Sequence, residues 1–283
     1  MIKANDTIFQ FYLAMMDSFE HFLSEKYPIS NSIEETKHYQ TIIIGKIVRM
    51  FHSLELLAKD TLDEVAARSV LRGILDSVTT YTFIYQRTDV NDMLFRHYLY
   101  ALDGWRVYKK SVITISEDNY YKYKEDFACD YVINQFEQKL RSHTYYYNDA
   151  ATTESLIQNA NWKYESLQNP RSLKYGEMYS IIGFNDNSMD YFQGFLSQFV
   201  HGLCLSNRTV VDSEQMKRIA YESIPIAARF IQAIYQTFHN KEMMIHLLSS
   251  ENINLLLNSK DFNYDDLADF VQSLVRKVNT ILI

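Results

Sequence analysis

The sequence predicts an all-α protein. Only 7 glycines and 3 prolines occur in 283 residues, which is about a third of the usual frequency of these turn-forming residues. A β-rich fold needs many tight turns, and tight turns depend on the backbone conformations that glycine and proline adopt most easily. Apolar residues also recur at steps of three and four, as they do on one face of a helix. We therefore expect a single large bundle of long antiparallel helices.

Five long helices are expected before residue 143. Each begins after a residue whose side chain can bond the open N–H groups of the first turn. In chain order they are residues 6–26 after Asn5 and Asp6, 33–59 after Ser32, 62–87 after Thr61, 90–115 after Thr88 and Asp89, and 117–142 after Ser116. Ser32 with Glu35 and Thr61 with Glu64 have the spacing of a capping box. In the fifth helix, Phe127, Tyr131 and Asn134 follow the spacing of one helix face.

Residues 143–187 are the least regular part of the chain. They contain the stretches TYYYNDAATT, NPRS and FNDNS, and we interpret them as an excursion from the bundle with short helices at 153–162 and 174–183. Longer helices then follow at residues 188–203 after Asn187 and Ser188, at 213–239 after the capping-box pair Asp212 and Gln215, and at 264–282 after Asn263. Pro225 should kink the helix 213–239, because proline lacks an N–H and clashes with the preceding turn.

The domain organisation is expected to be simple. The chain contains no internal repeat and no low-complexity linker. We predict one all-helical domain over residues 1–283, with a core bundle of about 33–142 and 188–239 and a C-terminal helix at 264–282.

Charge and cysteine content narrow the function classes. The net charge is −7 and the isoelectric point is near 5.6, so the surface as a whole does not attract nucleic acid or an anionic membrane, although a local basic pocket is compatible with it. Cys129 and Cys204 are isolated, which favours a reducing, cytoplasmic location. No apolar run reaches the roughly 18 residues of a membrane span, and the first 22 residues are typical of an amphipathic helix rather than a signal peptide.

A polar ridge runs along the helix EVAARSVLRGILDSVTTYTFIYQR. Arg68, Arg72, Asp76 and Thr80 stand at steps of four, and apolar residues cover most of the remaining circumference. Such a helix is usually central, so the charged ridge should be partly buried and must be paired or face a cavity. One interpretation is structural, with an Arg72–Asp76 pair and Arg68 bonded elsewhere. The other is a binding pocket.

The stretch LSQFVHGL, residues 196–203, places a serine and a histidine on one helix face. Ser197 and His201 are four residues apart, and Gly202 can end the helix in the left-handed conformation. A histidine in the last turn can act as a general base or donate to a phosphate. The alternative is a core histidine bonded to Ser197 or to a carbonyl. We expect this face to meet the Arg68–Asp76 ridge.

Three stretches resemble a bacterial all-helical family of unknown function. They are RSVLRGILD at 68–76, FRHYLYALDGW at 95–105 and LSQFVHG at 196–202. The family has an R-S-x-x-E-like helix, an R-x-Y-like helix and an S-x-x-x-H-G helix. The resemblance implies a shared pocket, and the matching positions are Arg68, Arg96, Tyr98, Ser197, His201 and Gly202. Where the family has its acidic residue this chain has Arg72, with Asp76 one turn later.

Other catalytic classes find less support. HEPN-type helical ribonucleases of prokaryotic defence systems use an arginine and a histidine four to six residues apart on one helix, and such a pair is missing here, so that likeness is a distant analogy. Di-iron helical bundles need two Glu-x-x-His units, and only Glu35 with His38 has the spacing. The sequence also lacks nucleotide-loop and zinc-protease motifs. Neither a metal nor another cofactor is expected.

Two main functions are compatible with these residues. In the first, Arg68, Arg72 and Arg96 form a pocket for an anionic ligand, a nucleotide or an RNA phosphodiester, with His201 as acid or base, Ser197 orienting it, and Asp76 or Tyr98 completing the hydrogen bonds. This would be a ribonuclease-like protein of defence or stress.

In the second function, the same arginine, aspartate and histidine residues form a structural network. The protein would then be a non-catalytic interaction module. It would form a homodimer or bind a protein partner through the tyrosine-rich segments 119–127 and 143–149 or the helix 264–282. A small-molecule sensor is a third option.

Overall fold

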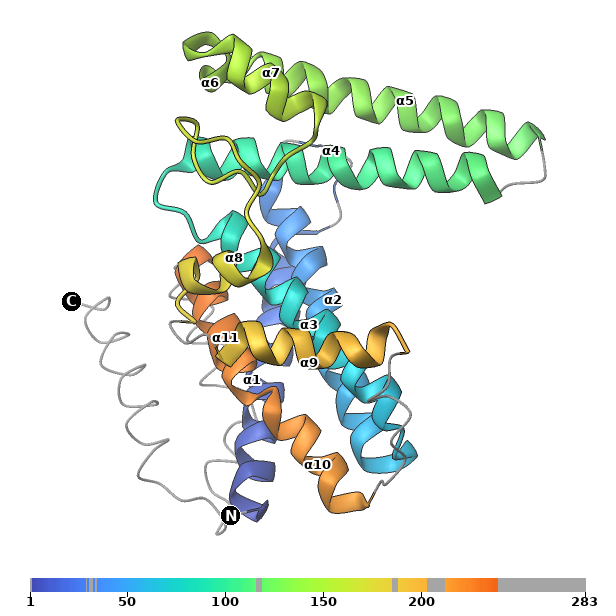
Figure 1. Ribbon diagram of the computed structural model, residues 1–283, viewed down its shortest axis with the longest axis vertical. Coiled ribbons are helices and arrows are strands. Elements are labelled where there is room, and N and C mark those ends of the chain that lie inside the picture. The colour runs from blue at the N-terminus through green and yellow to red at the C-terminus, as the bar shows by residue number, and fades with distance from the viewer. Residues whose placement is uncertain are drawn as a thin grey trace. The chain divides into compact units, whose positions relative to one another are not determined.

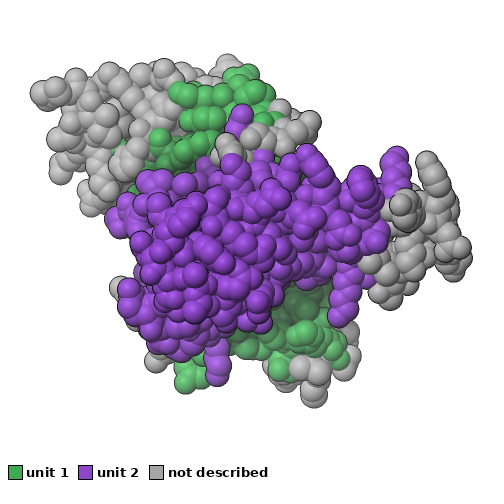
Figure 2. Space-filling view, turned by 90° about the horizontal axis from the view of Figure 1, so that it is seen from above, with its two compact units in different colours: residues 1–31, 37–82, 186–283 green, residues 32–36, 83–185 purple. Residues whose placement is uncertain are grey.

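The computed structural model describes residues 2–28, 30, 33, 35–115, 119–184, 188–202 and 212–238. Within these ranges every regular element is a helix and no strand occurs (Figure 1), which confirms the all-α helical bundle class. The chain divides into two compact units (Figure 2), unit 1 with residues 1–31, 37–82 and 186–283 and unit 2 with residues 32–36 and 83–185. The single domain over 1–283 stays a prediction, and the helix 264–282 lies outside the described residues.

Unit 1 contains the N-terminal helices and the helices that follow residue 186. They are α1 (Ile2–Lys26), α2 (Thr36–Leu56), the π-helix η1 (Leu57–Thr61), α3 (Glu64–Tyr85) up to residue 82, α9 (Ser188–Val200), α10 (Ser213–Glu222) and α11 (Ile224–Phe238). α1 packs against α10 and α11, and α10 also packs against η1. Phe9, Phe51, Leu75 and Phe230 are completely buried and belong to the core of this unit.

The start of α3 differs from the capping box predicted at Thr61. Thr61 is the last residue of η1, and Leu62 after it has φ 53° in the left-handed region. This left-handed residue interrupts the helical backbone between Thr61 and α3. Asp63 caps the helix instead, because its Oδ1 accepts a hydrogen bond of 2.9 Å from the backbone N–H of Ala66.

The predicted helix 213–239 is divided in two at Ser223. Asp212 caps α10 as expected, accepting from the N–H of Gln215 at 2.7 Å. Pro225 is the second residue of α11, where its missing N–H costs no helical hydrogen bond. The hydroxyl of Ser223 donates to the carbonyl of Ala220 at 2.6 Å. Proline therefore starts a new helix rather than kinking one long helix.

Unit 2 is built on a helical hairpin. α4 (Val90–Ile115) and α5 (Asn119–Arg141) run side by side in opposite directions (Figure 1). Leu99, Leu102, Cys129 and Phe136 are buried along this hairpin.

Ion pairs join the two helices of the hairpin. Lys109 pairs with Asp126 at 3.1 Å and with Asp130 at 2.6 Å, and Arg106 pairs with Glu137 at 2.9 Å. The positions of these partners along α5 run opposite to those on α4, which is the register of an antiparallel pair.

The predicted excursion over 143–187 is confirmed. It contains the short helices α6 (Thr144–Asn148), α7 (Ala150–Gln158) and α8 (Tyr175–Ile181), with an irregular segment between α7 and α8. No helix in the described part of the chain combines the length and the apolar character that a bilayer span requires.

Candidate functional site

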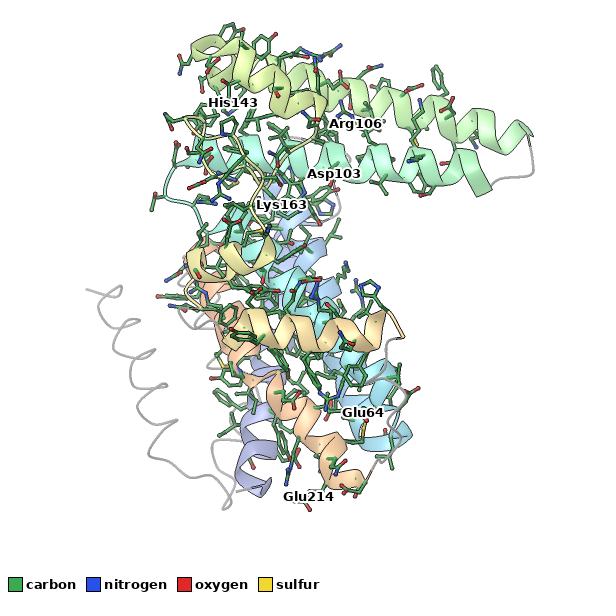
Figure 3. The ribbon with its side chains drawn as sticks, viewed as in Figure 1. Glu64, Asp103, Arg106, His143, Lys163 and Glu214 are labelled. Atoms are coloured by element: carbon green, nitrogen blue, oxygen red, sulfur yellow. The ribbon has the colours of Figure 1, made fainter. Side chains whose placement is uncertain are left out.

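Arg68 is the centre of the predicted site, and it bonds to carboxylates inside unit 1. Its Nε donates to Glu64 at 2.8 Å and its Nη1 donates to Glu222 of α10 at 3.1 Å (Figure 3 labels Glu64). The guanidinium also lies over the rings of Phe195 and Phe199 of α9, 4.8 and 5.1 Å from their centres. One side chain, only 13% exposed, thus joins α3, α9 and α10.

Arg72 makes the intrahelical contact that its spacing of four residues from Asp76 allows. It forms an ion pair with Asp76 one turn later, with Nη2 3.2 Å from Oδ2. From α9, the side-chain amide of Gln193 lies against both terminal nitrogens of Arg72, and its oxygen accepts from them when the amide is turned over. The Arg72–Asp76 pair of the structural interpretation is therefore present.

Arg96 has its partners within unit 2. The side chain is 1% exposed, donates to Asp92 at 2.9 Å, and also donates to the carbonyls of Trp162 and Tyr164 at 3.1 and 2.6 Å. Its guanidinium lies 3.7 Å from the centre of the Tyr164 ring. These contacts fasten the segment after α7 to α4, and they correct the predicted ligand-binding role, because burial keeps Arg96 out of reach of a ligand in solvent.

Tyr98 was also predicted to bind the ligand, and it too is buried. It is 8% exposed and packs against the rings of His97 and Phe136. In unit 2 this residue contributes to the packing between α4 and α5.

Ser197 and His201 do not make the predicted contact with the arginine ridge. The hydroxyl of Ser197 donates to the carbonyl of Gln193 at 3.0 Å, one turn back in its own helix. His201 is exposed, and its ring has no hydrogen-bond partner among the described residues. Each residue turns the helix by about 100°, so the buried face of α9, which carries Leu196 and Phe199, points away from His201. Gly202 ends the helix at φ 61°, as predicted.

Burial shifts the titration of several groups, and none of these groups forms an acid–base pair with His201. Burial raises the pKa of Glu222 above its ordinary value, although Arg68 opposes the shift. Burial lowers the pKa of His97 to about 4, and the ring bonds the Tyr85 hydroxyl through Nδ1 at 2.8 Å. General acid–base catalysis requires a base within hydrogen-bond reach of the proton that it takes. The groups at Arg68 are instead bound to one another.

A metal centre is not formed by the described residues. Within the described ranges no three His, Cys, Asp or Glu side chains gather as metal ligands. His38, from the single Glu-x-x-His spacing, is 6% exposed at the start of α2.

A different feature, the outer face of α5, is exposed and aromatic. Phe127 and Tyr131 are one turn apart and are 70% and 61% exposed. Lys124 and Asn134 are exposed on the same face. We define the outer α5 face by these four residues. The periodic pattern found in the sequence through Phe127 is therefore the exposed side of the helix.

The other face of α5 packs against α4 and α7. A second period of three and four, through Cys129, Ile133, Phe136 and Leu140, marks this buried face. That pattern was the signal in the sequence that could have distinguished the two sides of the helix.

The second tyrosine-rich segment, 143–149, is partly packed. The hydroxyl of Tyr145 donates to Asp89 at 2.8 Å, and its ring lies against Phe95 and His143. Tyr147 is 78% exposed on α6. Only part of this segment is thus available to another molecule.

The family resemblance drawn from the three short motifs stays a prediction. No protein-family model, no curated protein and no solved structure matches this chain.

Proposed function

We propose that this protein is a non-catalytic helical interaction module that self-associates through the outer α5 face. The observation that carries the proposal is the pair Phe127 and Tyr131, which stand one turn apart with most of their surface in solvent. Burying large aromatic side chains removes apolar area from water and stabilises association. The ion pairs that join α5 to α4 involve Asp126, Asp130 and Glu137, which lie outside this face.

The arginines support a structural network rather than an anion pocket. A nucleotide or an RNA phosphodiester at Arg68 would compete with the carboxylates of Glu64 and Glu222, and at Arg72 with Asp76. Each displaced carboxylate would remain next to the incoming anion, and like charges at short distance repel. This cost favours the interaction module over the ribonuclease-like function.

A second copy of the chain is the partner that the outer α5 face fits. If two α5 helices pack antiparallel about a two-fold axis, residue 127 of one copy lies opposite residue 131 of the other. The same axis sets Lys124 opposite Asn134, so no like charges meet. An interface of this kind is small, and we expect a weak dimer that depends on concentration.

Sedimentation analysis of the full chain tests the proposal. From about 1 to 200 µM, a range in which small interfaces associate, the wild type should shift from monomer to dimer. The double variant Phe127→Ser, Tyr131→Ser should stay monomeric. Tyr147→Ser removes an equally exposed aromatic outside the face and should dimerise like the wild type. A wild type that is monomeric throughout, or a double variant that still dimerises, would refute the proposal.

A further inference from the structure

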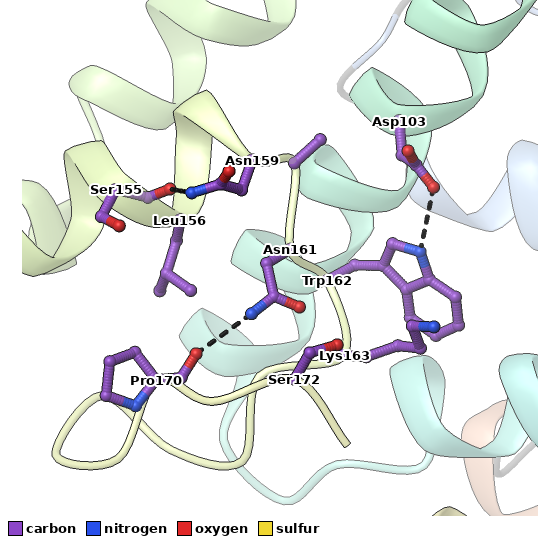
Figure 4. A pocket seen from close by; sticks show the side chains of 10 residues that line it. Asp103, Ser155, Leu156, Asn159, Asn161, Trp162, Lys163, Pro170 and Ser172 are labelled. Carbon is purple, nitrogen blue, oxygen red and sulfur yellow. Dashed lines mark hydrogen bonds between the residues drawn. The ribbon is translucent and has the colours of Figure 1, made fainter. Parts of the chain in front are cut away.

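A pocket of about 450 Å³ lies in unit 2, outside every site that the sequence indicated (Figure 4). Asp103 of α4 lines one side of the pocket. Ser155 of α7 and Asn159, which follows the last residue of α7, line another side. Trp162 and Lys163 come from the segment after this helix. Pockets of this volume accommodate small molecules. All of these residues belong to the same compact unit.

The side-chain amides on the pocket wall keep an oxygen for a ligand. Asn159 donates through Nδ2 to the carbonyl of Ser155 at 2.9 Å, and Asn161 donates to the carbonyl of Pro170 at 3.0 Å (Figure 4). Each amide has both donor and acceptor capacity. One N–H of each amide is bound to the backbone, and the acceptor oxygens of both side chains can receive a hydrogen bond from a ligand.

The pocket also holds two opposite charges that do not pair. The indole Nε1 of Trp162 donates to Asp103 at 3.3 Å, and the ammonium of Lys163 lies 5.6 Å from the centre of the same ring. Neither Asp103 nor Lys163 forms an ion pair with any described residue. Elsewhere in this unit half-buried cations do pair with carboxylates, as Arg106 does with Glu137. The wall thus presents a carboxylate at the indole N–H and an ammonium over the face of the same indole.

We propose that this pocket binds a free amino acid, with Asp103 binding its α-ammonium and Lys163 its α-carboxylate. A purely anionic ligand would face the unpaired carboxylate of Asp103, and a purely cationic ligand would face Lys163. A zwitterion satisfies both charges, and charge-assisted hydrogen bonds are the strong ones. The amide oxygens of Asn159 and Asn161 add acceptors for the ammonium or for a polar side chain. The inference does not depend on self-association through α5.

Tryptophan fluorescence gives a direct measurement, because the chain has only two tryptophans. In a Trp105→Phe background, Trp162 of the pocket is the single reporter. Each of the common L-amino acids is titrated to about 10 mM, well above the usual affinities of small-molecule sites. We expect saturable binding of at least one of them. The matching amine without the carboxylate, and the matching acid without the ammonium, should bind at least about tenfold more weakly.

Two pocket variants and one matched control test the residues. Asp103→Asn retains an acceptor for the indole, and Lys163→Met retains the aliphatic stem over the ring. Each should weaken amino-acid binding by about tenfold or more, since each removes a charge-assisted hydrogen bond. Lys217→Met changes a charge on α10 of unit 1 and should bind like the wild type.

Calorimetric titration of the unsubstituted chain repeats the measurement, so that a fault in the Trp105→Phe background cannot decide it. Circular dichroism establishes that each variant is folded. The proposal is overturned if no amino acid binds the wild type, if glucose, a neutral polyol, binds in place of amino acids, or if both pocket variants bind as tightly as the wild type.

Discussion

The guanidinium of Arg68 on α3 donates a 3.1 Å hydrogen bond to Glu222 on α10, although the two residues are 154 positions apart in the chain. Glu64 and the rings of Phe195 and Phe199 occupy the remaining sides of the same guanidinium. The side chain of Arg68 therefore contacts residues of three helices of unit 1, which are α3, α9 and α10.

Replacing Arg68 with methionine should destabilise the protein by about 1 to 3 kcal/mol. The change leaves the partly buried Glu222 without its cation, and an unpaired buried charge costs more than the net gain of the pair. Urea unfolding followed by circular dichroism measures the free energy of unfolding. Adding Glu222→Gln to Arg68→Met should recover part of the loss. Equal stability of Arg68→Met and wild type would contradict the structural role.

Arg96→Lys should also be strongly destabilising, by about 2 to 4 kcal/mol. An ammonium on a shorter head group cannot reproduce the planar fork that reaches Asp92 and the carbonyls of Trp162 and Tyr164, so buried acceptors lose their donors. Arg171→Lys is the matched control. Arg171 is half exposed in its pairs with Glu165 and Glu177, and replacing it with lysine should change the stability little. The melting temperatures of the two variants compare the sites, and a smaller drop for Arg96→Lys would count against this account.

Stability should fall as the pH falls from about 6.5 to about 4, with His97 as one cause. Burial lowers the pKa of His97 from 6.5 to about 4 in the folded protein. Between these values the unfolded chain binds a proton at His97 that the folded chain does not bind, so acid favours unfolding. The contribution is on the order of 3 kcal/mol when the whole interval is crossed.

The variant His97→Gln isolates this contribution. It keeps a polar partner for Tyr85 and does not titrate in this range. Its free energy of unfolding should depend less on pH than that of the wild type in urea titrations at pH 7 and pH 4.5. The same pH dependence in both proteins would show that His97 is not responsible.

Substitutions at the two adjacent residues after α9 should differ in their effect on stability. His201→Ala removes an exposed ring and should change stability by less than about 0.5 kcal/mol. Gly202→Ala places a side chain at φ 61°, where a Cβ is strained, and should cost about 1 kcal/mol. Thermal melts of both variants give the comparison. A large loss in His201→Ala would contradict the exposed position of the ring.

The sequence was sufficient for the helices and for part of their boundaries. The scarcity of glycine and proline and the apolar spacing predicted an all-α chain, and Asp212 and Gly202 act at helix ends as expected. The start of α3 was not predicted correctly from the sequence, because the left-handed Leu62 moves the cap from Thr61 to Asp63. Nothing in the spacing of these residues distinguishes the two caps.

The candidate site was predicted only in part. Arg72 and Asp76 pair as their spacing indicated, because both partners lie on one helix. The predicted contact of Ser197 and His201 with the ridge is not among the contacts of the described residues, where Gln193, Phe195 and Phe199 of α9 lie against the arginines. Both faces of that helix contain aromatic and polar residues, so periodicity alone did not select one.

By itself, the sequence determined which segments are helical and which neighbours one turn apart can bond, because these properties depend on residues within a few positions of each other. The tertiary structure decided that Arg68 binds Glu222, that Arg96 holds the segment after α7, and that the indole of Trp162 donates to Asp103. Each of these contacts joins elements far apart in the chain, and their partners depend on how whole helices pack and exclude water from apolar surface.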